Sequence, residues 1–185
     1  MFLNRLFSST GRRTAPDGLD ELRWRTLCKM IIAASMGDPT AAHRACSQLA
    51  ERRPAEPRDG HAAVYLWFLI RYRVLELLGR TPTEDDLHDL AVRFNPRFAR
   101  VARQDRDPDL LQRTLRTYYE LTTLDDEVAG GLVVVAGTAA LGAMLDNPQA
   151  QLEAMRPHLA KWLRDNGEYL RNIGLLQQPA VPPAP

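Results

Sequence analysis

The chain has 185 residues, the size of one domain and enough to bury a hydrophobic core. Its 24 basic residues balance 23 acidic ones, and a formal charge of +1 provides no general attraction for nucleic acid or anionic membranes. Two cysteines are too few for a disulfide scaffold and suit a reducing compartment, so we expect a cytoplasmic protein. Nearly all the basic residues are arginines, which together with the many alanines and prolines is typical of coding in a GC-rich bacterium.

The composition along the chain predicts three regions. Residues 1–15 form an apolar tip and a polar linker, and the apolar tip is too short for the core of a signal peptide. Residues 16–174 form a single helical domain. Residues 175–185 form a tail whose prolines exclude a helix and favour an extended polyproline conformation.

Helix signals follow one another through the domain. Four prolines come directly after a capping residue, as is typical of the first turn of a helix: Asp38-Pro39, Thr81-Pro82, Asp107-Pro108 and Asn147-Pro148. Thr81 and Glu84 have the spacing of a capping box, and Gly37 and Gly79 stand where helices should end. The predicted helices are 17–36, 39–53, 61–78, 82–94, 97–104, 108–122, 125–146 and 148–172. The sequence therefore predicts an all-α fold, a compact bundle of about seven or eight helices.

The bundle should open with an antiparallel helical hairpin that turns at Gly37 and Asp38. Cys28 and Cys46 are at similar distances from that turn, so they should lie at similar heights. We expect both thiols to be reduced and poorly accessible, as small apolar fillers. A redox switch is the alternative, and it requires Cα atoms closer than about 7 Å.

Two short stretches resemble known families. Gly37 to Ala42, followed by Pro54, is similar to the turn, second helix and terminal proline of a tetratricopeptide repeat. The resemblance covers only one repeat, because Arg71 stands in place of the turn glycine one 34-residue period later. It implies a helical hairpin. Leu78 to Leu87 is similar to a stretch of bacterial sigma factors that opens a helix of the DNA-binding type.

The segment Val128–Leu145 contains no charged residue. It fits best a buried core helix whose small residues let neighbouring helices pack closely. A membrane span is the second interpretation, although the segment barely reaches the required length. The third is a strand at 132–136 leading into a nucleotide-binding loop, in which Ala139 would replace a glycine of the fingerprint.

Candidate metal and catalytic groups are sparse. Asp85 and His88 are three residues apart and would share a helix face, but no second carboxylate–histidine pair accompanies them. Acidic residues at a helix start are already explained by the helix dipole. We therefore predict no metal and no cofactor, and no catalytic residue can be named.

Two segments are candidate binding sites. The first is an apolar stripe on the N-terminal tip, which would need a groove on a partner: Phe2, Leu3, Leu6 and Phe7. The second is a ridge of arginines at helical spacing, able to hold phosphates: Arg93, Arg97, Arg100 and Arg103. A solvated face paired with Asp105, Asp107 and Asp109 is the simpler interpretation of that ridge.

The leading hypothesis is a non-enzymatic helical interaction module: an adaptor, a regulator or a component of a larger assembly whose partner is another protein. The alternative is a nucleic-acid-binding regulator that uses the arginine-rich face 93–116. A helical enzyme with dispersed catalytic residues is third, and a membrane-associated protein is fourth. No membrane span is expected, since the one candidate segment is weakly apolar.

Overall fold

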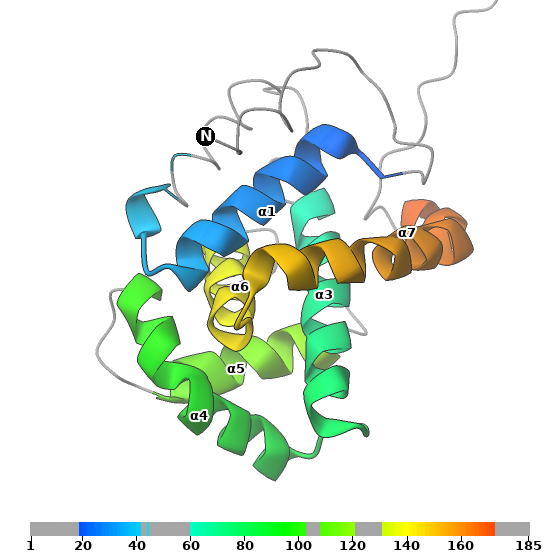
Figure 1. Ribbon diagram of the computed structural model, residues 1–185. Coiled ribbons are helices and arrows are strands. Elements are labelled where there is room, and N and C mark those ends of the chain that lie inside the picture. The colour runs from blue at the N-terminus through cyan, green and yellow to red at the C-terminus, as the bar shows by residue number, and fades with distance from the viewer. Residues whose placement is uncertain (1–18, 42–43, 45–59, 103–107, 121–130, 173–185) are drawn as a thin grey trace, which may run out of the picture.

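The computed structural model describes residues 19–41, 44, 60–102, 108–120 and 131–172. These residues form an all-α bundle, as the sequence predicts (Figure 1). Its helices are α1 (Glu21–Ser35), α3 (Gly60–Leu78), α4 (Glu84–Ala102), α5 (Pro108–Glu120), α6 (Gly131–Met144) and α7 (Pro148–Asn172). The N-terminal tip, the proline-rich tail and both predicted domain boundaries lie outside the described residues.

Helix α6 is the centre of the bundle, and it packs against α1, α3, α4 and α5 (Figure 1). Every residue from Ala139 to Leu145 is buried or a glycine enclosed by other helices. The predicted helix is therefore confirmed for 131–144, and its burial for Val134 and for 137–145, whereas Val135 is 45% exposed. Residues 128–130 lie outside the described part of the chain. The nucleotide-loop interpretation is wrong, because residues 132–136 are helical and Gly137 and Gly142 lie inside the same helix.

Small residues of α6 permit close contacts between helices. A Cβ placed on Gly142 would lie 2.9 Å from the Ser35 backbone nitrogen and 3.0 Å from the Ile31 carbonyl oxygen, so α1 passes directly over this glycine. On another side, a Cβ on Gly137 would lie 2.5 Å from the fully buried ring of Tyr118 on α5. The glycines thus let a backbone on one side and an aromatic ring on the other approach the axis of α6.

Helix α7 packs against α1 and α3 (Figure 1). Arg156 of α7 donates to Glu21 at the start of α1 at 2.8 Å. The helix begins at Pro148 after the Asn147 cap, as predicted, and Pro157 lies inside it. None of the helices among the described residues combines the length and the apolarity that a membrane crossing requires.

Helix α4 differs from the prediction. Two helices, 82–94 and 97–104, were expected on either side of Asn95-Pro96, but α4 runs continuously from Glu84 to Ala102. Pro96 cannot donate to the carbonyl of Val92. Both residues lie on the exposed face, where water can satisfy that carbonyl, so the helix continues through the proline.

The turn after α1 has the predicted geometry. Gly37 has a φ of +73°, and its N–H donates to the Ala34 carbonyl while the N–H of Asp38 donates to the Ala33 carbonyl. This is a Schellman motif, which satisfies two carbonyls at the end of a helix. Asp38 then accepts from the N–H of Ala41 at 2.9 Å and caps the next helical turn. The hairpin and tetratricopeptide-like unit stay predictions, because most of 42–59 lies outside the described residues.

Cys28 should behave as an unreactive thiol. It is packed against the core, and burial raises the pKa of its thiol to about 12, so the reactive thiolate is scarce at neutral pH. In a Cys46→Ser variant, which isolates Cys28, a thiol reagent should react slowly with the native protein and quickly with the denatured protein. Fast native labelling would contradict this packing. Cys46 itself lies outside the described residues, so the pairing of the two cysteines stays untested.

Candidate functional site

Five side chains form an aromatic surface where α3 meets α7: Trp67, Phe68 and Tyr72 of α3 and His158 and Trp162 of α7. The ring centroids of Trp162 lie 5.2 Å from Trp67 and 5.3 Å from Phe68. Tyr72 follows Phe68 by four residues on α3, and His158 precedes Trp162 by four residues on α7. The ring centroids of Tyr72 and His158 lie 5.0 Å apart. The two helices therefore cross at these rings. Trp67 and Trp162 meet edge to face, a geometry that aromatic pairs prefer, and the other two contacts are tilted.

This aromatic surface reaches solvent. Trp67, Phe68, Tyr72 and Trp162 are only partly buried, and His158 is exposed. Tyr169 is 59% exposed and follows Trp162 by seven residues, so it continues the same face of α7 two turns further on. The rings thus pack against one another at their base, and their exposed parts could still be covered by a partner.

Arg71 closes one edge of the aromatic surface. Its guanidinium carbon lies 5.4 Å from the ring centroid of Trp67 and 4.6 Å from that of Tyr119, and it donates a hydrogen bond to the Tyr119 carbonyl at the end of α5. The arginine is therefore sandwiched between two aromatic rings and holds α5 against α3.

One polar atom in the aromatic surface has no partner among the described residues. The indole Nε1 of Trp67 is buried and makes no hydrogen bond there. Buried indole N–H groups ordinarily have an acceptor, and leaving a donor unsatisfied costs free energy. This atom is a donor that an acceptor on a bound chain could satisfy after a small movement of the ring.

Sequence reasoning missed the aromatic surface. The predicted helix 61–78 contains an apolar run, 64–70, in which Val64, Leu66, Leu69 and Ile70 are buried but two aromatic residues, Trp67 and Phe68, are half-buried. The available signal was the type of residue, because tryptophan and tyrosine carry polar groups that favour the edge of a core.

The predicted arginine ridge lies on α4 and is partly neutralised. Arg93, Arg97 and Arg100 are exposed, while Arg103 lies outside the described residues. Arg97 pairs with Asp146 at 2.8 Å, and its hydrogen bond is the main cause that lowers the pKa of that carboxyl. The Arg93 guanidinium lies over the ring of its neighbour Phe94, at 5.0 Å.

The arginines have acidic partners beyond those that were expected. Arg116 of α5 pairs with Glu84 at the start of α4, and its hydrogen bonds lower the pKa of that carboxyl. Of the predicted partners, Asp105 and Asp107 lie outside the described residues, and Asp109 offers its backbone carbonyl, 3.4 Å from Nε of Arg113. The face carries charges of both signs.

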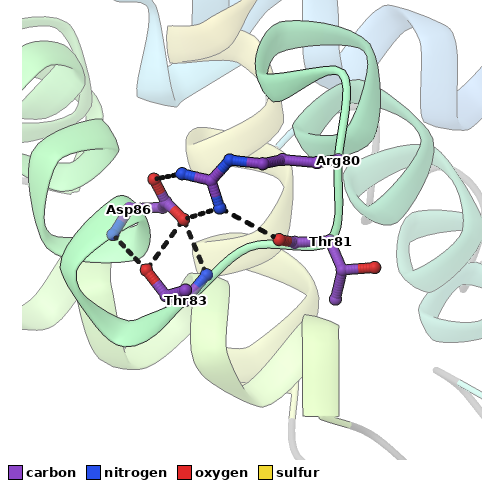
Figure 2. Close-up of polar contacts among 4 residues, drawn as sticks. All are labelled: Arg80, Thr81, Thr83 and Asp86. Atoms are coloured by element: carbon purple, nitrogen blue, oxygen red, sulfur yellow. Dashed lines mark hydrogen bonds and ion pairs between the residues drawn. The ribbon is translucent and has the colours of Figure 1, made fainter.

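The start of α4 is held by a capping box two residues later than predicted (Figure 2). Asp86 accepts from the N–H and the hydroxyl of Thr83, at 2.7 and 2.8 Å, and its own N–H donates to the Thr83 hydroxyl at 3.3 Å. Thr83 caps the helix in place of Thr81, and Glu84 is released to bind Arg116. Arg80 donates to both oxygens of Asp86, at 2.6 and 2.7 Å. The stretch 78–87, which resembles part of sigma factors, thus opens a helix. The capping of that helix is enough to explain the resemblance.

Asp86 should govern part of the acid stability. Hydrogen bonds from Thr83, then from Arg80, lower the pKa of Asp86 from 3.8 to about 2. A carboxyl with a lowered pKa contributes stability above its unfolded-state pKa, and this contribution is lost as the pH falls towards 2. Asp86→Asn should therefore flatten the dependence of the unfolding midpoint on pH below 3.8. Asp85→Asn removes a neighbouring charge without touching the Arg80 pair, and an equal flattening in that variant would contradict the assignment.

The remaining predicted sites divide into two groups. The apolar tip of Phe2, Leu3, Leu6 and Phe7 lies outside the described residues. At Asp85 and His88, where no metal is predicted, Nδ1 of His88 lies 3.0 Å from Oε1 of Gln112, and Asp85 is exposed. The described residues contain no group of three or more histidines, cysteines or acidic residues placed to hold a metal ion. The absence of a metal stays a prediction.

No protein family, curated protein or solved structure matches the chain.

Proposed function

We propose that this chain is a non-enzymatic helical interaction protein, an adaptor, regulator or component of a larger assembly, that binds another protein through the aromatic surface of α3 and α7. The observation that carries the proposal is the group of interlocked rings that reach solvent at one helix crossing. Tryptophan and tyrosine dominate the binding energy of protein interfaces because they bury large areas with few rotatable bonds.

The charged face of α4 supports the nucleic-acid alternative less well. A phosphate-binding ridge needs uncompensated cations, since affinity comes from releasing counterions of the phosphates. Arg97 and Arg116 are instead each paired with a carboxylate. Weak salt dependence of any binding to nonspecific DNA would agree with this assignment.

The described thiol lends no support to the enzyme alternative. Cys28 has its pKa raised to about 12, chiefly by burial, which disfavours the nucleophilic thiolate. His158 contacts Tyr72, and His88 contacts Gln112. Neither contact aligns a base with a nucleophile.

Site-specific photocrosslinking tests the proposal. A photoreactive phenylalanine analogue is introduced at His158, which is exposed at the aromatic surface, and at Val92, which is 51% exposed on α4 and serves as the control. In cells of the native host, position 158 should yield a discrete crosslinked protein and position 92 should not. A discrete product at 92 alone, or nucleic acid crosslinked there, would contradict the proposal and favour the charged face.

A further inference from the structure

The chain carries a segment with the chemistry that aromatic surfaces bind. Residues 177–185 read Gln-Gln-Pro-Ala-Val-Pro-Pro-Ala-Pro, so Pro179 and Pro182, and again Pro182 and Pro185, have the PxxP spacing. Such segments favour the polyproline II helix, which has three residues per turn and therefore aligns these prolines on one face. Recognition of proline-rich segments uses exposed aromatic rings, because the preformed helix loses little entropy on binding.

We propose that the proline-rich segment 179–185 of this chain docks on its own aromatic surface between α3 and α7. This inference rests on the proposed function of that surface and identifies the segment that occupies the surface in the free protein. Proline rings would pack against Phe68, Tyr72 and Trp162. The Trp67 indole N–H, which has no acceptor among the described residues, would donate to a carbonyl of the segment. Polyproline II backbone has free carbonyls, because it makes no internal hydrogen bonds.

The connection is long enough. Trp162 stands ten residues before Asn172, the end of α7, which corresponds to about 15 Å of helix at ~1.5 Å per residue. The six residues 173–178 can span roughly 20 Å when extended, at about 3.3 Å per residue. Pro179 can therefore reach the level of Trp162, and segment 179–185 would add about 22 Å if it adopted the polyproline II helix. That length is sufficient to run from Trp162 to the Tyr72–His158 contact.

Because the segment belongs to the same chain, its docking would regulate the access of a partner to the aromatic surface. A segment tethered by a short linker has an effective concentration on the order of millimolar. A weak contact is then largely occupied in the free protein, and an external partner must displace it. A partner with its own proline-rich segment would compete for the same rings.

Indole N–H signals in a ¹H–¹⁵N spectrum of the full-length protein test the proposal. Trp67 and Trp162 report on the aromatic surface, while Trp24, on α1 and only 5% exposed, is the internal control. Replacing Pro179, Pro182, Pro183 and Pro185 with serine should shift the signals of Trp67 and Trp162 and leave Trp24 unchanged. A control variant with Gln177→Ser and Gln178→Ser should resemble the wild type.

A peptide of residues 177–185 provides the second arm. Added to the serine variant, it should return the Trp67 and Trp162 signals towards their wild-type positions. The wild type should need at least about tenfold more peptide, because its tethered segment competes. Unchanged indole signals in the serine variant would overturn the proposal, and so would signals that depend on protein concentration, which would place the segment of a second copy on the surface. If the indole signals are unchanged but crosslinking at position 158 captures a partner, only the docking of the tail fails, whereas the function of the surface stands.

Discussion

Replacing Gly142 with alanine should destabilise the protein by about 1–3 kcal/mol, although alanine is the better helix former. The new Cβ would lie 2.9 Å from the Ser35 nitrogen, 3.0 Å from the Ile31 oxygen and 3.1 Å from the Ala34 Cβ. The first two are backbone atoms of α1, which cannot move aside as a side-chain end can. Helices α1 and α6 must therefore separate, and their close contact in the core is loosened.

Chemical denaturation measures this effect against a control. Ala154 is exposed on α7, and Ala154→Gly should cost only the difference in helix propensity, about 1 kcal/mol. If Gly142 had space around it, the alanine variant would instead be stabilised by a similar amount. A stabilised Gly142→Ala protein would show that α1 does not pass over α6 at this position.

Arg73→Met should destabilise the protein by about 1–3 kcal/mol, because it leaves a buried carbonyl without a donor. Arg73 is 7% exposed, and its Nε and Nη2 donate to the Met144 carbonyl at 3.1 and 3.0 Å. Met144 ends α6, so this carbonyl has no donor within its own helix. Methionine retains the apolar stem of the arginine, which isolates the loss of the guanidinium.

Two further variants separate the hydrogen bonds from the charge. Arg73→Lys keeps the charge but loses the forked geometry, and it should recover only part of the stability. Arg100→Met removes an exposed arginine from α4 and should change stability by no more than about 0.5 kcal/mol. Arg73→Met at wild-type stability would mean that burying the guanidinium costs as much as its bonds contribute.

Local rules predicted most of the helices. Asp38-Pro39 and Asn147-Pro148 cap helical turns as expected, and Gly37 and Gly79 adopt the positive φ that ends a helix. These signals act over four or five residues, so they can be read directly. The predicted start of α4 was wrong by two residues. Thr81 and Thr83 each have an acidic residue three positions later, and only Thr83 forms the capping hydrogen bonds with it.

Features that depend on tertiary context were not predictable. Pro96 interrupts a helix by local rules, but the sequence alone does not show that the freed carbonyl faces solvent. The aromatic surface joins α3 to α7 through Trp67 and Trp162, which lie far apart in the chain and share no motif. Contacts of this kind depend on the crossing of two helices. The arginine ridge was visible in the sequence, whereas its partner Asp146 comes from the corner between α6 and α7.

The most direct test is the affinity of the crosslinked partner for two double variants. His158→Ala with Tyr169→Ala alters exposed side chains of the α7 face, whereas Val92→Ala with Arg93→Ala alters exposed side chains of α4. Both proteins should keep the wild-type thermal midpoint, as expected for surface changes. We expect at least about tenfold weaker binding, roughly 1.4 kcal/mol, for the α7 variant and unchanged binding for the α4 variant. Unchanged binding by the α7 variant together with weaker binding by the α4 variant would contradict the proposed role of the aromatic surface.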